Sequence, residues 1–207
     1  MSLLDREEDI INNIEGLIKS FLQANYRFSH DAITNCIKDG DIYVINIKRG
    51  VIRANKTIET LTNGFFRFGY VDIFDCPYCS NLKSLEGAPS RCRSFYCNEC
   101  NGLKNLIGAP HDCDIFSCSK CINLESLEGA PEYGSIFHCD GCDALKDLCG
   151  IEETNYSLMD FYSCINLQSL RGLHVKHKYH TFDFRNCPKL YPIIISLPLE
   201  DRKCFKF

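Results

Sequence analysis

The sequence lacks the features that mark nucleic-acid-binding, membrane-spanning and secreted proteins. Its 23 Lys and Arg against 27 Asp and Glu give a formal net charge of −4, so no basic excess points to nucleic acid or an anionic membrane surface. It has no apolar run of about 20 residues, the length of a membrane span, and no basic-then-apolar segment of the secretory type. We therefore expect a protein that binds neither nucleic acid nor membranes.

Motifs of catalysis are also missing. No nucleophile–base pair, glycine-rich phosphate loop or paired acidic motif occurs in a setting that supports a reaction. Acidic residues such as Glu86 and Glu128 are spread over repeated positions, where we expect them to solvate the surface. The sequence therefore predicts that the protein is not an enzyme.

Cysteine, in contrast, is abundant: the chain has 15, and eight of them form Cys-x-x-Cys pairs that recur every 21 residues. The pairs are Cys76/Cys79, Cys97/Cys100, Cys118/Cys121 and Cys139/Cys142. A fixed period places them at equivalent positions in a stack of like units. Because the count is odd and no secretory segment is seen, we expect reduced thiols in a reducing compartment, the cytoplasm of the producing or host cell.

The pairs belong to a longer repeat that ends in Gly-Ala-Pro. Its clearest copies read FDCPYCSNLKSLEGAP, FYCNECNGLKNLIGAP and FSCSKCINLESLEGAP, beginning at Phe74, Phe95 and Phe116. Drifted copies begin at Val51, Phe137, Met159 and Phe182, which gives roughly seven units between about residues 50 and 195. Gly-Ala-Pro closes the three clearest copies, and with such a break every 21 residues a unit has no room for a long helix. Each is expected to hold a short strand, a turn and a return segment of turns or 3₁₀ helix.

The segments outside the repeats carry their own patterns. Apolar spacing predicts a helix over about residues 5–24, a shorter helix is expected over about 30–38, and alternation predicts two strands joined by a turn at Arg49-Gly50. The chain then divides into an N-terminal helical cap (1–40), a β-hairpin with a degenerate first repeat (41–72), the repeats (73–173), and a last degenerate repeat with a C-terminal cap (174–207).

The motif Phe74-x-Cys76-x-x-Cys79-x-x-Leu82-x-x-Leu85 resembles the leucine-rich repeat, in which two apolar strand positions precede an Asn or Cys. The resemblance implies an α+β repeat fold: a right-handed solenoid with a parallel sheet on its concave face, turns and 3₁₀ helix on its convex side, and an N-terminal helical cap. The form Asn-Leu-x-Ser-Leu-Glu-Gly-Ala-Pro is similar to short cysteine-containing repeats of tailed bacteriophages, other large DNA viruses and bacteria.

Two interpretations of the Cys-x-x-Cys pairs stay open. Strands about 4.8 Å apart stack the thiols into two columns of small hydrophobic side chains. The same spacing suits zinc held by four thiolates drawn from the eight paired cysteines. Because Phe161 and Phe184 replace the first Cys, and Asn55 falls in the column of the second, packing is favoured and no cofactor is expected. The run His174-x-x-His177-x-x-His180 is interpreted as a solvated loop.

Side chains that flank the inward positions must point away from the core. These outward positions vary from unit to unit while the inward ones repeat, which predicts a separately chosen binding face. The candidate partner-binding residues are Asp75, Tyr96, Asn98, His138, Asp140, Asp160, Tyr162 and Arg185. Beside them runs an apolar stripe, either exposed or covered by a terminal segment, formed by Ile73, Ile115, Ile136 and Leu158.

These patterns together predict a non-catalytic module that binds a partner protein through its concave face. The resemblance to viral repeats implies a role directed at a host or defence factor. Two alternatives stay open: a zinc-stabilised structural protein, and a self-assembling structural component that forms homo-oligomers.

Overall fold

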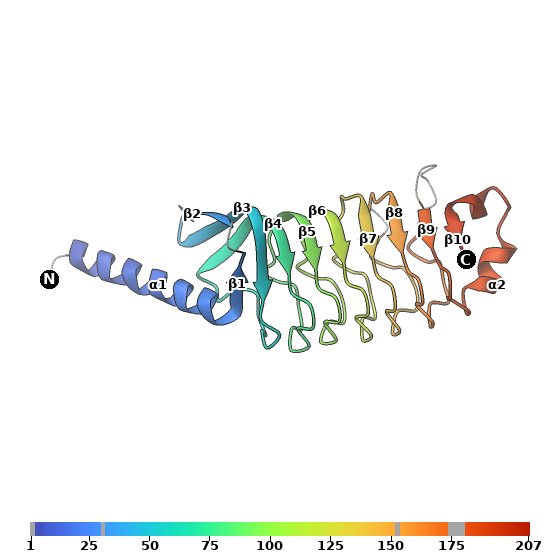
Figure 1. Ribbon diagram of the computed structural model, residues 1–207, viewed down its shortest axis with the longest axis horizontal. Helices are drawn as coiled ribbons and strands as arrows, with labels where there is room; N and C mark the ends of the chain where they lie inside the picture. The colour runs from blue at the N-terminus through green and yellow to red at the C-terminus, as the bar shows by residue number, and fades with distance from the viewer. Residues whose placement is uncertain (1–2, 30–31, 152–153, 174–180) are drawn as a thin grey trace.

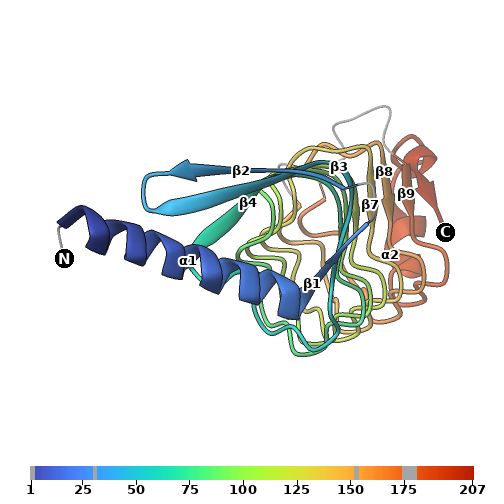
Figure 2. The same cartoon turned by 60° about the vertical axis from the view of Figure 1, so that its left-hand side comes forward.

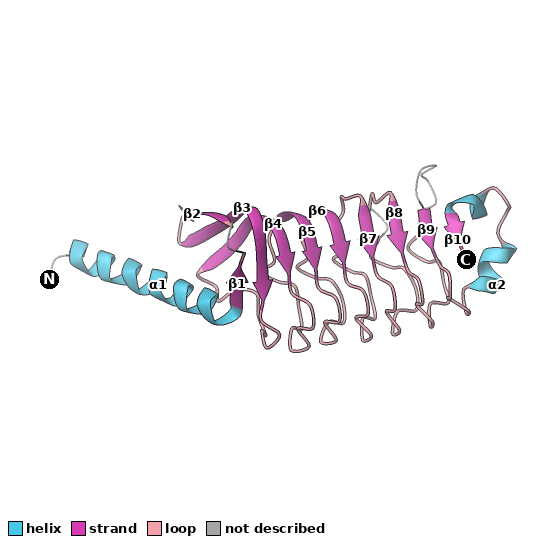
Figure 3. Cartoon of the chain, viewed as in Figure 1, coloured by secondary structure: helices cyan, strands magenta, loops and turns pink. Residues whose placement is uncertain are grey.

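The chain forms a β-solenoid in a computed structural model that describes residues 3–29, 32–151, 154–173 and 181–207 (Figure 1). Seven successive strands, β3 to β9, pair in parallel along one side, and turns return the chain along the other (Figure 3). The strands are β3 (Ile42–Ala54), β4 (Phe66–Asp75), β5 (Arg91–Tyr96), β6 (Asp112–Ser117), β7 (Ile136–His138), β8 (Leu158–Asp160) and β9 (Thr181–Asp183). The predicted units of strand, turn and irregular return are confirmed for the described coils.

Aromatic side chains stack through the core because the repeats place a phenylalanine at the same strand position in each coil from β4 to β7. Phe74 lies 5.1 Å from Phe95, Phe95 5.6 Å from Phe116, and Phe116 5.4 Å from Phe137, measured between ring centroids. All four rings are fully buried. Full burial of such a side chain stabilises the fold by about 1.5–3 kcal/mol, so this column is a main source of stability.

The turn inside each Cys-x-x-Cys motif uses a left-handed residue. The position before the second Cys has φ near +60°, and it carries Tyr78, Glu99, Lys120, Gly141, Ser163 and Asn186 in successive coils. The left-handed residue reverses the chain so that both cysteines of a pair reach the interior. Five of these six residues are not glycine, and the left-handed conformation costs each of them about 1–2 kcal/mol. The packing of the coils must offset this cost.

The N-terminal region differs from the sequence prediction. The segment expected to be helical over about residues 30–38 is, where described, strand β2 (Ile33–Asp39), which pairs antiparallel with β3. Gly40 and Asp41 form the two-residue hairpin turn between the register partners Asp39 and Ile42, and Gly40 has φ +60°, a conformation that glycine adopts readily. The prediction of a turn at Arg49-Gly50 is also wrong, because β3 continues through both residues as one strand. Gly50 has φ +99° and lies where the pairing of β3 with β4 shifts register. The hairpin is therefore β2–β3.

Helix α1 (Leu3–Asn25) confirms the helix predicted over about residues 5–24, and only its C-terminal turns lie against the solenoid. Ile18 is buried, and the ring of Phe21 lies 5.8 Å from that of Phe66. The rest of α1 projects away from the coils (Figure 2). Strand β1 (Tyr26–Phe28) pairs with one half of β3 and β2 with the other, so both halves of this sheet edge are occupied.

The C-terminal segment adds one short strand and two helical turns. Strand β10 (Phe205–Lys206) pairs in parallel with β9, and Phe205 packs 5.5 Å from Phe184. Helix α2 (Tyr191–Ser196) places Ile194 in the core, and a 3₁₀ helix spans Asp201–Cys204. The predicted His174–His180 loop lies outside the described residues.

Candidate functional site: the outer face of the sheet

The outer sheet face is formed by the side chains that alternate with the buried strand positions. Parallel pairing in register aligns a first column of Asp75, Tyr96, Ser117, His138, Asp160 and Asp183. Two residues later in each coil a second column carries Pro77, Asn98, Ser119, Asp140, Tyr162 and Arg185. Residues predicted to face outward from different coils are thereby brought side by side.

Hydroxyl and amide groups connect the two columns at the middle of the face. Ser117 Oγ donates a hydrogen bond to Asn98 Oδ1 (2.6 Å), and Ser117 and Ser119 share a hydroxyl contact of 3.2 Å. Ser119 Oγ in turn donates to Asp140. These contacts link the polar side chains to one another and, through Asp140, to the acidic part of the face.

His138, Asp140 and Asp160 form one cluster. A ligand atom from each lies within 4.8 Å of the other two, and all three side chains are half-buried. His138 Nδ1 lies 3.4 Å from Asp160 Oδ2. Hydrogen bonding to Asp160 raises the pKa of His138, an effect that partial burial opposes and the charges of Asp160 and Asp140 reinforce.

Arg185 and Tyr162 occupy the C-terminal end of the face. The Arg185 guanidinium donates to Asp183, with a shortest contact of 2.6 Å, and lies 5.8 Å from the centre of the Tyr162 ring. The hydrogen bond from Arg185 lowers the pKa of Asp183, although burial of that carboxyl opposes the shift. Tyr162 remains 44% exposed, so an aromatic ring backed by a cation is available to a partner.

The N-terminal end of the face holds ion pairs that the sequence prediction missed. Arg53 Nε lies 2.6 Å from Asp75, and Arg93 Nε lies 2.8 Å from Asp72. Arg53 and Asp75 are register partners on β3 and β4. The spacing of the coils would have indicated this pair if β3 had been predicted as a single strand. Tyr96 lies beside Asp75 and is half-buried.

The apolar stripe is half-buried along its length. Ile73, Ile115, Ile136 and Leu158 stand in register, and Ser94 interrupts them on β5. None of the four is among the strongly exposed hydrophobic residues.

Inside the solenoid, the second cysteine of each pair forms a ladder with the backbone of the preceding coil. Cys100 Sγ donates to the carbonyl of Cys76 (3.0 Å), and Cys121 Sγ donates to that of Cys97 (3.2 Å). Cys142, Cys164 and Cys187 repeat this contact at 3.3, 3.1 and 3.1 Å. The thiols thereby satisfy carbonyl groups that lie away from water.

Among the described residues, the sulfurs do not converge in fours, which is what a structural zinc site requires. One trio gathers within 4.8 Å, formed by Cys118, Cys139 and Cys142. All eight paired cysteines are fully buried, and burial raises the pKa of Cys97 and Cys118. Cys142 differs, because hydrogen bonds with Cys118 and Cys139 lower its pKa to about 5. Since no fourth sulfur joins the trio, this geometry fits the packing interpretation better than zinc.

An apolar groove that the sequence prediction missed lies between α1 and the β2–β3 hairpin. Its volume is about 680 Å³, and its apolar lining includes Ile18, Leu22, Tyr26 and Ile45. Cys36 lines it from β2. The groove could not be predicted because it depends on the hairpin, whose first strand was expected to be a helix.

Thiol labelling should separate Cys36 from the interior cysteines. Cys36 is exposed, twelve cysteines are buried, and Cys149 and Cys204 are intermediate. We expect a maleimide to modify Cys36 first in the reduced native chain, and all fifteen cysteines after denaturation. Partial burial and nearby Glu15 raise the pKa of Cys36, so its labelling should accelerate as the pH rises. Mass spectrometry of peptides measures each rate.

The matched control for this experiment is Cys36→Ser, which should remove the fastest label and leave the others unchanged. Labelling of Cys97 or Cys118 as fast as Cys36 would contradict the buried ladder.

The fold and its patterned face define the chain as a parallel β-solenoid repeat protein. Comparisons with protein-family models, curated proteins and solved structures give no match. Among the described helices, none has the length and apolar character needed to cross a membrane.

Proposed function

We propose that this protein is a non-catalytic, leucine-rich-repeat-type module that binds a partner protein through its outer sheet face, the concave face in that class. The observation that carries the proposal is the contrast between the columns. Inward positions repeat Phe, Cys and Leu, whereas the outward columns change residue type in almost every coil. The variety supplies aromatic, acidic and basic groups on one face, as a binding surface requires.

The side chains best suited to anchor a partner are Tyr96, Tyr162 and Arg185. Tyrosine and arginine dominate the energetics of protein interfaces because they supply large contact areas together with hydrogen bonds. Arg185 is already held by Asp183, so little side-chain entropy remains to be lost when it binds. His138, Asp140 and Asp160 lie between these anchors and add negative charge.

The terminal segments serve as caps in this proposal, with α1, β1 and β2 at one end of the stack and α2 and β10 at the other. The resemblance of the repeats to those of bacteriophages and other large DNA viruses supports an intracellular role against a host or defence factor. In that role the solenoid blocks a surface of its target.

Removing the two tyrosines tests the face. The double variant Tyr96→Ala/Tyr162→Ala is expected to weaken binding of a captured partner at least about 100-fold, because two anchors together contribute about 3 kcal/mol or more. Biolayer interferometry against the purified partner measures the affinity. Circular dichroism verifies that the variant is folded.

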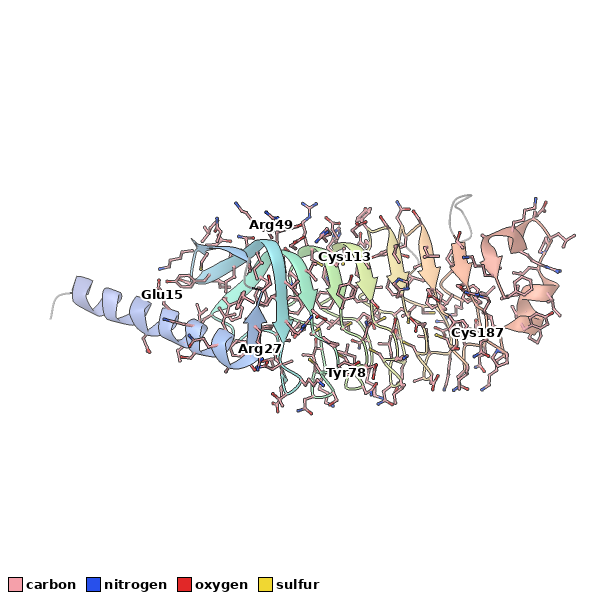
Figure 4. The ribbon with its side chains drawn as sticks, in the orientation of Figure 1. Glu15, Arg27, Arg49, Tyr78, Cys113 and Cys187 are labelled. Carbon is pink, nitrogen blue, oxygen red and sulfur yellow. The ribbon has the colours of Figure 1, made fainter. Side chains whose placement is uncertain are left out.

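A matched control removes two tyrosines that belong to neither outward column. Tyr78, 48% exposed, lies among the turns (Figure 4), and Tyr191, 51% exposed, lies on α2. The variant Tyr78→Ala/Tyr191→Ala should bind as the wild type does. If both double variants bind equally well, the outer sheet face is not the interface.

A further inference from the structure

We propose that His138, Asp140 and Asp160 form a binding site for a divalent transition-metal ion on the outer sheet face. The site would supply three protein ligands and leave the remaining coordination positions to water or to a group of a partner. This inference goes beyond the protein-binding proposal and does not depend on it.

The backbone brings the three side chains together from two neighbouring coils. His138 ends β7 and is the register partner of Asp160 on β8. Asp140 lies in the turn that follows β7, with a carboxylate oxygen within 4.8 Å of the ligand atoms of the other two. Backbone hydrogen bonds lock the coils at this level: Cys139 N donates to Asp160 O, and Gly141 N to Tyr162 O, both at 2.8 Å. A site on such a support needs little reorganisation to bind an ion.

The separation between imidazole and carboxylate fits shared coordination. Two ligand atoms that each lie about 2.1 Å from an ion, at a tetrahedral angle, are about 3.4 Å apart. His138 Nδ1 and Asp160 Oδ2 are 3.4 Å apart, a long hydrogen bond and also the separation of two such ligands. The pair can therefore take up one ion with little change in the distance between the two atoms.

Neighbouring groups orient both carboxylates. The backbone N–H of Tyr162 donates to Asp160 Oδ1 (2.9 Å), which leaves Oδ2 toward His138. Ser119 Oγ holds Asp140 Oδ1. Partners of this kind fix metal ligands in place and are worth about 10- to 100-fold in metal affinity.

The charges of the cluster also favour a cation. Two carboxylates face one imidazole, and Arg185, on the neighbouring coil, is engaged by Asp183. One nitrogen and two carboxylate ligands suit Mn²⁺, Zn²⁺ and related ions, whereas Ca²⁺ and Mg²⁺ prefer oxygen alone.

A second histidine with acidic neighbours provides an internal contrast. His111 contacts Asp112 through Nδ1 (2.9 Å) and Glu132 through Nε2 (3.2 Å). Because the two ring nitrogens point in different directions, these carboxylates cannot share one ion with the imidazole. Its side chain is also 58% exposed, against 35% for His138.

Titration with Mn²⁺, followed by the electron paramagnetic resonance signal of the free ion, tests the site on the full chain under reducing conditions. Mn²⁺ is chosen because thiolates prefer softer ions, so the cysteines do not compete. We expect one bound Mn²⁺ per chain. His138→Asn and Asp160→Asn should each weaken binding at least about tenfold, the loss expected for one ligand, while His111→Asn should leave it unchanged.

The pH dependence provides a second readout. The proton on His138 competes with the ion, because a histidine must be neutral to act as a ligand. Mn²⁺ affinity should therefore fall as the pH drops through the histidine pKa, and this dependence should disappear in His138→Asn.

Three results would overturn the proposal: no stoichiometric Mn²⁺ binding, equal binding by wild type and Asp160→Asn, or loss of binding in His111→Asn. Asp140→Asn, in a turn after the strand, serves as the ligand variant if another fails to fold. None of these outcomes involves a partner protein, so they are distinct from failure of the proposed interface.

Discussion

Replacing Gly129 with alanine is expected to lower the free energy of unfolding by about 2–5 kcal/mol. Gly129 has φ +85°, and a Cβ added there would lie 2.6 Å from the backbone of Ile107 in the preceding coil. The left-handed backbone costs about 1–2 kcal/mol for a residue with a side chain, and forcing coils apart costs about 1–3 kcal/mol more. Urea denaturation under reducing conditions, followed by circular dichroism, measures the change.

Gly64→Ala separates the two costs. Gly64 has nearly the same backbone conformation, with φ +86°, but a Cβ added there would meet no atom within 4 Å. We expect a loss of about 1–2 kcal/mol, the backbone cost alone. If Gly129→Ala is no more destabilising than Gly64→Ala, contact between coils is not what requires glycine at position 129.

The interior of the solenoid could be predicted from the sequence because one inward residue type recurs at one spacing. Cys76, Cys79 and Phe74 were expected to be inward, and all three are fully buried. The drifted copies were informative: Phe161 and Phe184, which replace the first Cys, stack at 5.5 Å in the core. Because the same position recurs in seven coils, the periodic pattern is a strong indication of which residues face inward.

The first 50 residues were predicted less well because they contain no repeat. Over residues 33–39 the pattern is short, and a short pattern does not distinguish helix from strand. What decides the strand is its pairing with β3 across the Gly40-Asp41 turn, a tertiary contact. The groove beside Cys36 follows from that pairing.

The outer sheet face was predictable as a set of columns, but its internal contacts were not. The sequence places His138 beside Asp160 once the coil spacing is known. It does not show that Asp140 joins them or that Arg185 folds back onto Asp183, because these contacts depend on side-chain rotamers. The candidate metal site thus emerges only from the three-dimensional arrangement.

The second large effect is expected at the aromatic column. Phe116→Ala should destabilise the protein by about 3–5 kcal/mol, the usual range for removing a buried phenylalanine. Its ring is fully buried between Phe95 and Phe137, so the cavity is closed on both sides by coils that cannot approach without breaking strand pairing. Because each coil contacts its neighbours, the loss should also weaken cooperativity between the two halves of the stack.

Phe116→Met is the control that the chain itself supplies, since Met159 occupies the same column on β8 and is buried. A flexible side chain of similar volume should cost less than about 1.5 kcal/mol. Urea denaturation of both variants, with hydrogen exchange of β5 and β7 amides, gives the free energies and locates the damage. Similar losses for Ala and Met would mean that stacking geometry matters more than filled volume. A loss below about 1 kcal/mol for Ala would contradict the column as a main source of stability.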